Sequence, residues 1–271
     1  MKELVYNNIC FIDRKYINSM KKRKNVFLKA ENLSLEIPII TKNDLSLKKT
    51  FVRSITGGRV ARNKGLTIIR ALTNINLTIH SGERIGLIGH NGAGKSSFIR
   101  LLSGIYEQTS GVLKCPVKAF PMLQKSFIVS DSLTGIDEAK ARYLLRNNNL
   151  KNFKFFLDDI TNFSGLGDYI ALPIKTYSSG MCARLIFALL TYDSHEFLAL
   201  DEVIGTGDAT FHDKAEERLT NFIKKAGTLI IASHSSQLLE NFCKRGLVFS
   251  KGSIVYDGKL KDALDFYDSR N

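Results

Sequence analysis

Short runs of consecutive apolar residues predict several buried strands in this chain. Ile85 to Ile88, Phe197 to Leu200 and Thr228 to Ala232 are mostly apolar and carry no charge. Such runs are typical of strands covered on both faces, as in a mostly parallel sheet. Between the last two runs, apolar residues recur at helical spacing before Gly227: Phe211, Ala215, Leu219, Phe222, Ile223 and Ala226. Strands that alternate with helices predict an α/β fold.

Other patterns predict two additions to this core. Apolar positions roughly alternate from Val26 to Ile37, where Pro38 is expected to end the strand, and again from Ile68 to Ile79. This alternation predicts an antiparallel β subdomain. The stretch from about Ser126 to Tyr177 has no sheet-like run and predicts mostly helix, so we expect an inserted helical subdomain.

Near the end of the chain, two short apolar runs flank the turn residues Lys251-Gly252. Leu247 to Phe249 and Ser253 to Tyr256 are the two runs. A pair of strands joined by such a turn is a hairpin.

A glycine-rich segment follows the first apolar run. Residues 89–96 read GHNGAGKS and fit G-x-x-x-x-G-K-[ST] in full, between a predicted strand and a helix predicted over Ser97 to Ser103. In this context the backbone N–H groups and the helix N-terminus bind the phosphates of a nucleotide. Lys95 would neutralise the β- and γ-phosphates, and the Ser96 hydroxyl would bind Mg²⁺. The predicted nucleotide-binding residues here are Gly89, His90, Asn91, Gly92, Ala93, Gly94, Lys95, Ser96 and Ser97.

Two carboxylates follow the second apolar run. Asp201 and Glu202 would stand at the carboxyl end of a parallel strand, the sheet edge where open α/β folds bind ligands. Asp201 is then a candidate Mg²⁺ ligand, and Glu202 a candidate general base for the water that attacks the γ-phosphate. Without the glycine-rich segment, the same pair would be read as a solvated turn.

Composition narrows the class of protein. Of the 271 residues, 44% are hydrophobic and 24% are charged, as in a globular protein with a sizeable core. No window reaches the roughly 18 apolar residues of a membrane span, and the segment after Met1 lacks the apolar stretch of a secretory signal. We therefore expect a cytosolic chain. The four cysteines form no C-x-x-C pair, which predicts reduced thiols: Cys10, Cys115, Cys182 and Cys243.

The net charge of +13 is concentrated in the N-terminal quarter of the chain. Residues 1–70 hold 16 Lys and Arg against 5 Asp and Glu, with Lys21, Lys22, Arg23 and Lys24 in a row. Such a segment can contact anionic lipid or nucleic acid, or be a solvated extension. Nucleic-acid binding is the least favoured of the three, because no known recognition motif accompanies the charge.

A third motif narrows the choice among ATPases. Residues 177–181 read YSSGM and precede an apolar helix that runs through Leu190, and the segment resembles the LSGGQ signature of ABC ATPases. Ser179 and Met181 depart from that signature, whereas Ser178 and Gly180 keep a hydroxyl and a bare helix N-terminus that would face a γ-phosphate. On its own the segment could be only a helix N-cap.

Three further residues stand in the order that the ABC ATPase family shows. Gln124, after the strand-like run Ala119 to Leu123, matches the Q-loop, Asp208 matches the D-loop, and His234 matches the switch histidine. The resemblance implies that Gln124 binds nucleotide and Mg²⁺, and that Lys95, Glu202 and His234 are catalytic. It covers nearly the whole chain, from about Leu28 onward.

The finer resemblance is to the ATPase subunits of bacterial exporters of O-antigen, capsule and teichoic acid. Residues 201–211, DEVIGTGDATF, are similar to that group's D-E-V-x-x-x-G-D-x-x-F, and Gly111 also fits. The aromatic residue that stacks on adenine in the family is replaced by aliphatic residues around Ile37, and Phe51 is a candidate substitute. The chain ends soon after Tyr267, so we expect no C-terminal carbohydrate-binding domain.

The resemblance implies a P-loop NTPase core and an ATPase that powers export of a surface polysaccharide or lipid-linked glycan. It implies a head-to-tail homodimer with ATP and Mg²⁺, working peripherally on the cytoplasmic side of the inner membrane with a separate permease of the ABC-2 type. We expect a basic extension over residues 1–25 and the ATPase domain over 26–271, with the helical subdomain at about 126–180. The alternatives are a non-transport ABC ATPase acting in translation or on DNA, and a metabolic phosphotransferase.

Overall fold

The computed structural model describes residues 26–39, 60–63, 66–123, 130–201 and 209–270. These residues fall into two compact units. Unit 1 takes in the chain up to Pro121 together with residues 196–201 and 227–271, and unit 2 takes in residues 122–195 and 202–226. Each unit is described by itself.

Unit 1 contains the buried sheet that the apolar runs predict. Strands β9, β4, β8 and β7 are neighbours in that order and pair in parallel, β10 pairs antiparallel with β9, and β6 stands at the other edge. Every residue of β8 is buried. The strands are β4 (Arg84–Ile88), β6 (Phe120–Leu123), β7 (Phe197–Asp201), β8 (Thr228–Ala232), β9 (Arg245–Ser250) and β10 (Ser253–Lys259). The mostly parallel sheet and the hairpin are both confirmed.

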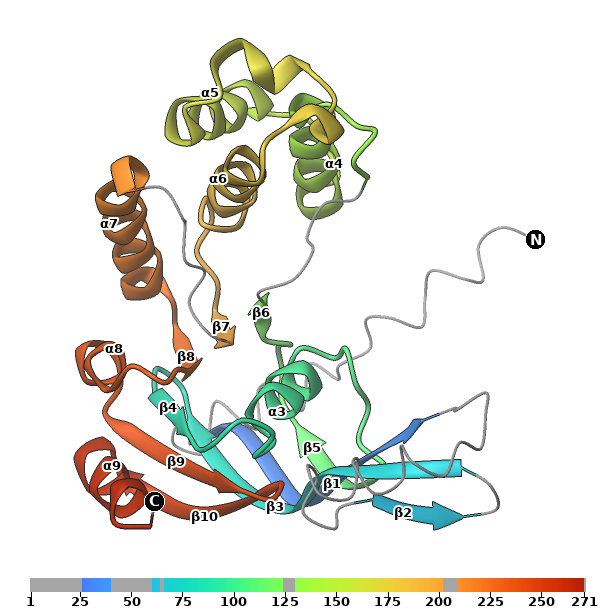
Figure 1. The fold of residues 1–271 in the computed structure, drawn as a ribbon, viewed down its shortest axis with the longest axis vertical. Helices are drawn as coiled ribbons and strands as arrows, with labels where there is room; N and C mark the ends of the chain where they lie inside the picture. The colour runs from blue at the N-terminus through green and yellow to red at the C-terminus, as the bar shows by residue number, and fades with distance from the viewer. Residues whose placement is uncertain (1–25, 40–59, 64–65, 124–129, 202–208, 271) are drawn as a thin grey trace. The chain divides into compact units, whose positions relative to one another are not determined.

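In the described part of unit 1 three helices accompany this sheet, and two of them carry no motif and were not predicted. Phe98 of α3 packs on Phe249 of β9, with ring centroids 5.5 Å apart. Helix α9 lies along β9 and β10 (Figure 1), and Ala263 sits so close to Gly246 that a Cβ on that glycine would lie 2.5 Å from the alanine Cβ. The helices are α3 (Lys95–Leu102), α8 (Ser236–Phe242) and α9 (Leu260–Asp268).

A second, antiparallel sheet of unit 1 has the order β2-β3-β1-β5. Phe27 of β1 meets Phe197 of β7 edge-on at 5.3 Å, which joins the two cores. The strands are β1 (Val26–Ile39), β2 (Val60–Asn63), β3 (Leu66–His80) and β5 (Ser110–Lys114). The antiparallel subdomain is confirmed.

The expected end of the first strand at Pro38 is wrong, because β1 continues to Ile39. Pro38 is paired with Ile68 of β3. On the other side of β1, the pairing with β5 reaches only Ser34. Among the described residues no strand pairs with that side of β1 beyond Ser34, so the missing N–H of a proline removes no ladder hydrogen bond there.

Unit 2 is helical, as predicted. Thr134 and Asp137 form a capping box at the start of α4, with the Asp137 N–H donating to Thr134 Oγ1 at 3.0 Å. The unit extends past Gly180 and takes in α6 and α7 as well. Its elements are α4 (Gly135–Asn147), α5 (Phe153–Ser164), η1 (Gly167–Ala171), η2 (Ile174–Thr176), α6 (Ser179–Leu190) and α7 (Ala209–Lys225).

No helix in the described part of the chain is long and apolar enough to span a membrane. Cys115, Cys182 and Cys243 form no disulfide, as predicted, whereas Cys10 lies outside the described residues. Burial raises the pKa of Cys115 to about 11 and that of Cys243 to about 12, so both thiols are protonated near neutral pH.

Candidate active site

The glycine-rich segment connects β4 to α3 and takes a shape that its glycines allow. Gly89 has a φ of 147°, and a Cβ there would lie 2.5 Å from the carbonyl oxygen of Phe249. Gly94 has a φ of 117° and directly precedes α3. Both are conformations that residues with a side chain rarely adopt. Because Gly94 already ends the loop, α3 begins at Lys95, two residues before the predicted start at Ser97.

The turn between β9 and β10 is hydrogen-bonded to the glycine-rich loop. The N–H of Gly252 donates to the carbonyl of Ala93 at 2.7 Å, and the N–H of Thr73 donates to the carbonyl of Gly252 at 2.9 Å. Ser253 Oγ also donates to the Thr73 carbonyl, at 3.0 Å. The sequence predicts this turn only as part of a hairpin and gives no sign of its contact with the loop.

Lys95 is the first residue of α3, and only 8% of it is exposed. Its Nζ donates to the carbonyl oxygens of Gly89 and of His90, the latter at 3.2 Å. An ammonium group is a compact charge with three hydrogen-bond donors. The loop carbonyls hold this group within the predicted phosphate-binding loop. The site therefore has one cation at the position that the motif predicts.

Ser96 and Asp201 meet although they are 105 positions apart in the sequence. Ser96 Oγ donates to Asp201 Oδ1 at 3.0 Å, which places the hydroxyl after the loop beside the carboxylate that ends β7. The described residues contain no cluster of three or more His, Cys, Asp or Glu that could hold a metal by itself. One hydroxyl and one carboxylate suit Mg²⁺ that takes its other ligands from phosphate oxygens and water.

His234, which follows β8, reaches the glycine-rich loop. Its Nε2 lies 2.9 Å from Oδ1 of Asn91. An amide oxygen only accepts, so this contact places the imidazole proton on Nε2. The motif order predicted both residues but not their contact, which depends on β4 and β8 being neighbours in the sheet.

The signature-like segment lies in unit 2 at the start of α6. Ser178 is the N-cap, and its Oγ accepts from the N–H of Met181 at 3.2 Å. A Cβ on Gly180 would meet only Ser178 Oγ, at 3.9 Å, so the space beside this helix N-terminus is open. Tyr177 is buried, donates to the carbonyl of Tyr169 at 2.7 Å and anchors the segment; burial raises the pKa of its hydroxyl. An open helix N-terminus with a hydroxyl is suited to bind an anion.

The structure thus brings together Lys95, Ser96, Asp201 and His234 around the loop of unit 1, and presents Ser178 with Gly180 in unit 2. The other predicted loop residues Gly92, Ala93 and Ser97 belong to the same turn and helix. Four predicted residues lie outside the described part of the chain: Phe51, Gln124, Glu202 and Asp208.

A cavity of about 340 Å³ lies next to the glycine-rich loop. Leu72 lines this cavity and also contacts the loop, because its Cδ2 is 3.3 Å from the position that a Cβ on Gly94 would take. Ile37, at the place where the family carries an aromatic residue, pairs with Ile69 in the neighbouring strand. None of the residues that line the cavity is aromatic: Ser34, Glu36, Arg70, Leu72, Thr73, Thr109 and Ser110. Among the described residues, the lining thus offers no ring to stack on a base.

The β4-loop-α3 segment carries the Lys95 ammonium group and the Ser96 hydroxyl, and Ser96 lies beside the carboxylate that ends β7. This arrangement defines a P-loop nucleoside triphosphatase. Residues 72–205 match the family model for ABC transporters. The O-antigen export system ATP-binding protein RfbE of Yersinia enterocolitica is 37% identical over 231 residues, which cover 85% of this chain and 96% of RfbE. The teichoic acids export ATP-binding protein TagH of Enterococcus faecalis is 34% identical over 238 residues. These residues cover 88% of this chain but only 53% of TagH, so the chain spans about half of that relative.

Among solved structures, a dimeric ATP-binding cassette in a post-hydrolysis state with ADP and Pi superposes with a TM-score of 0.62 at 15% identity. The match covers 86% of this chain and 99% of that one. The chain therefore belongs to the ABC transporter family, as an ATP-binding subunit that hydrolyses ATP.

Proposed function

We propose that this chain powers the export of a surface polysaccharide or lipid-linked glycan through a separate integral-membrane permease of the ABC-2 type. The observation that carries the proposal is the match to RfbE, which extends over 96% of that protein at 37% identity. The chain would work as a homodimer, bound peripherally to the cytoplasmic side of the bacterial inner membrane.

The loop of unit 1 accounts for how ATP is held. Lys95 turns from the loop carbonyls to the β- and γ-phosphates when they enter, while the loop N–H groups and the N-terminus of α3 surround the same oxygens. Ser96 and Asp201 would hold Mg²⁺, directly and through its water shell respectively, and Gln124 would be a further contact. Bound there, the cation would neutralise charge that develops on the phosphate oxygens.

Hydrolysis also needs a general base for the attacking water and a hydrogen-bond donor for the γ-phosphate. Glu202 would accept a proton from the attacking water as the bond from the γ-phosphorus to the ADP oxygen breaks. His234 would donate from Nε2 to a γ-phosphate oxygen, in exchange for its contact with Asn91. Ser178 and Gly180 of the partner subunit would close the site from the other side, which is why a dimer is needed.

The direct test is to coexpress the chain with its permease, purify the complex in lipid nanodiscs and measure ATP hydrolysis with and without the lipid-linked glycan. We expect stimulation by the glycan, and its loss in Lys95→Ala. A complex whose turnover is unaffected by any lipid-linked glycan of the host would contradict the substrate class. Asp201→Asn tests the Mg²⁺ site, because it should raise the Mg²⁺ concentration needed for turnover without abolishing metal-free nucleotide binding.

The basic N-terminal segment gives the proposal a second part, contact with anionic lipid. Each Lys or Arg near an anionic membrane surface contributes about 1 kcal/mol, and the attraction falls with salt. Removing residues 1–24 should leave hydrolysis intact and weaken flotation with phosphatidylglycerol vesicles at low salt. Equal flotation of both forms across a range of salt would exclude this contact.

A further inference from the structure

The connection between α4 and α5 in unit 2 is basic. Residues 139–157 contain five Lys and Arg and no Asp or Glu. Arg142 is paired with Glu138 at 2.7 Å, and Arg146 is paired with Asp193. Among the described residues, three further exposed cations of this stretch have no ion-pair partner: Lys140, Lys151 and Lys154. The surface of this connection therefore carries an excess of positive charge.

The same connection exposes large apolar side chains. Leu145 of α4 is 80% exposed and Phe155 of α5 is 71% exposed, the two highest values for large apolar residues in the described part of the chain. Leu150, in the turn between the helices, and Leu144 are exposed as well. We call residues 144–155 the α4–α5 tip. Single exposed apolar residues are ordinary on a protein surface, whereas four within twelve residues indicate an interaction site.

The shape of the α4–α5 tip does not depend on these exposed side chains. Tyr143 packs against Phe153 and Phe156, with ring centroids 5.5 and 5.2 Å away. The Tyr143 hydroxyl donates to the carbonyl of Lys151, and the N–H of Lys151 donates to Asn149 Oδ1 at 2.9 Å. These residues build the local core and the turn, so the exposed apolar side chains are available to a partner.

The two most exposed apolar residues lie close to the turn that joins the helices. Leu145 stands three residues before the C-cap Asn148, and Phe155 stands three residues after the N-cap Asn152. At the helical rise of about 1.5 Å per residue, each is about 5 Å from the turn along its helix. Apolar side chains of surface-bound helices enter the headgroup boundary of a bilayer to about 5–10 Å. A membrane surface that meets the turn can therefore reach both residues.

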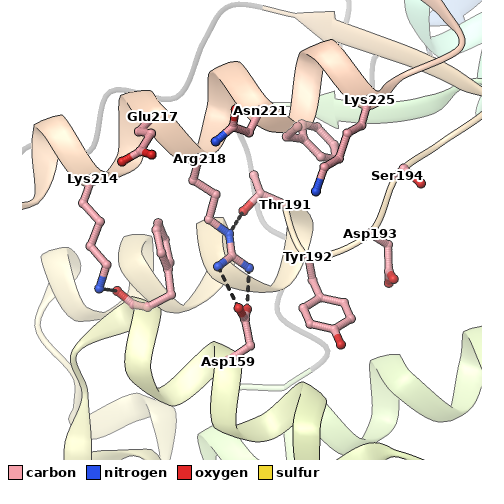
Figure 2. Close-up of a pocket in the computed structure, with 12 residues that line it drawn as sticks. Asp159, Thr191, Tyr192, Asp193, Ser194, Lys214, Glu217, Arg218, Asn221 and Lys225 are labelled. Atoms are coloured by element: carbon pink, nitrogen blue, oxygen red, sulfur yellow. Dashed lines mark hydrogen bonds and ion pairs between the residues drawn. The ribbon is translucent and has the colours of Figure 1, made fainter.

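Elsewhere in unit 2, a pocket of about 370 Å³ has charges that compensate one another (Figure 2). Arg218 Nη2 and Nη1 bind the two carboxylate oxygens of Asp159 at 2.6 and 3.3 Å. The lining includes three carboxylates and three cations: Asp159, Asp193, Glu217, Lys214, Arg218 and Lys225. Charge complementarity therefore favours the α4–α5 tip over this pocket as the contact for an anionic partner.

We propose that the α4–α5 tip binds the anionic surface of a phospholipid membrane. The lysine ammonium groups contact lipid phosphates, and Leu145 and Phe155 enter the headgroup boundary. Lysine is depleted in protein–protein interfaces, whereas lysines beside Leu and Phe are typical of segments that lie in a membrane interface. The inference goes beyond the proposed export of a glycan, and it concerns a different part of the chain from the basic N-terminal segment.

The test measures flotation of the full chain with vesicles of phosphatidylglycerol and phosphatidylcholine over a range of salt. Lys151→Gln with Lys154→Gln should lower the partition coefficient about 25-fold at low salt, because each lysine near an anionic surface contributes about fivefold. The loss should shrink as salt screens the charges. Leu145→Ser with Phe155→Ser should lower the partition coefficient at every salt concentration, because apolar burial is not screened.

Lys225→Gln with Lys261→Gln is the matched control. It removes the same charge from exposed positions of α7 and α9 and leaves the N-terminal segment as it is. This variant should partition like the parent chain within about twofold. Both tip variants should keep the unfolding temperature of the parent chain and its ATP hydrolysis in solution, which shows that they are folded.

A fluorescence measurement locates the contact. The chain contains no Trp, so Phe155→Trp introduces a single reporter. Its emission should shift to shorter wavelength with phosphatidylglycerol vesicles and should be quenched by brominated lipid. Val255→Trp, at an exposed position of β10, should show neither change.

The proposal is overturned if both tip variants float like the parent chain, or if the control variant loses as much binding as they do. An unshifted emission of Phe155→Trp on vesicles that carry the protein would overturn it too. Tip variants that bind vesicles normally but no longer purify with the permease would assign the tip to a protein partner instead. The vesicles hold neither permease nor glycan, so failure of the proposed export would leave these results unchanged.

Discussion

Among single side chains, Lys95 is the one whose replacement should change ATP binding and hydrolysis most clearly. Its ammonium group is nearly buried and is held by the Gly89 and His90 carbonyls, with no second cation in the motif to replace it. Lys95→Ala should lower kcat about 10²- to 10³-fold, the usual effect of removing one preorganised donor, and should weaken ATP binding. Fluorescent-nucleotide titration and a phosphate-release assay measure both quantities.

Lys114, an exposed residue of β5, provides the control for that experiment. Lys114→Ala should bind and hydrolyse ATP like the parent chain. If Lys95→Ala retained normal turnover, the assignment of this loop as the phosphate site would be wrong.

The loop residues were predictable from sequence because the motif fixes their spacing and each glycine has a local reason. The contact of Asn91 with His234 was not, since 143 positions separate the two residues and only the sheet order brings them together. For the same reason the hydrogen bonds of Arg218 with Asp159 and Thr191 have no signal in the sequence, where the three residues look like ordinary polar positions.

Among the strands, β1 and β5 meet at a point where only glycine fits. A Cβ on Gly111 would lie 2.3 Å from the carbonyl oxygen of Asn32, and its φ is 79°. Gly82 has the same φ of 79° with nothing within 4 Å of a Cβ. Gly82→Ala should therefore cost only about 1–2 kcal/mol, the backbone penalty. Gly111→Ala should cost a further 1–3 kcal/mol or so, because a strand must shift.

Urea unfolding of the two variants measures this difference directly, because both share the backbone term. Equal losses of unfolding free energy would contradict the close approach of β5 to β1. Sequence reasoning noted Gly111 only as a match to the exporter group, and β5 itself was not predicted, since its five residues are mostly exposed and lack an apolar run.

Within unit 2, His195 should make stability depend on pH. Burial, and to a lesser degree the nearby Arg146, lower its pKa from 6.5 to about 4. Between these two values the unfolded chain binds more protons than the folded chain, so stability rises with pH through that window and falls on acidification from pH 7 to pH 5. Because the ring is only partly buried, we expect a modest effect.

His195→Gln should narrow the difference between the unfolding temperatures at pH 7 and pH 5. His212→Gln, at a side chain 64% exposed on α7, should leave the difference unchanged. An unaltered difference in His195→Gln would show that other groups set the acid sensitivity.

At the scale of the whole molecule, the fold class and the two kinds of subdomain could be predicted from the spacing of apolar residues along the chain. The division into two units did not follow from them. Helix α7 reads in the sequence as a crossover between β7 and β8, and its apolar positions give no hint that residues 211, 214 and 218 rest on α5. Packing partners about 50 positions apart are set by tertiary contacts, which one sequence does not encode locally.

In the proposed dimer, ATP is bound between two copies of this chain and hydrolysed with Glu202 as the base. Glu202→Gln keeps the shape of the side chain and removes the base, so hydrolysis should fall roughly 10²- to 10⁴-fold. Binding should survive through Lys95, Ser96 and Asp201. The closed dimer should then accumulate with both signature segments intact.

The most direct measurement is size-exclusion chromatography with light scattering, in Mg-ATP, of Glu202→Gln beside the parent chain. We expect a dimer for Glu202→Gln that disappears when ATP is replaced by ADP, and mostly monomer for the parent chain. A Glu202→Gln protein that loses hydrolysis yet stays monomeric in ATP would contradict the shared site, and one that hydrolyses normally would contradict the base.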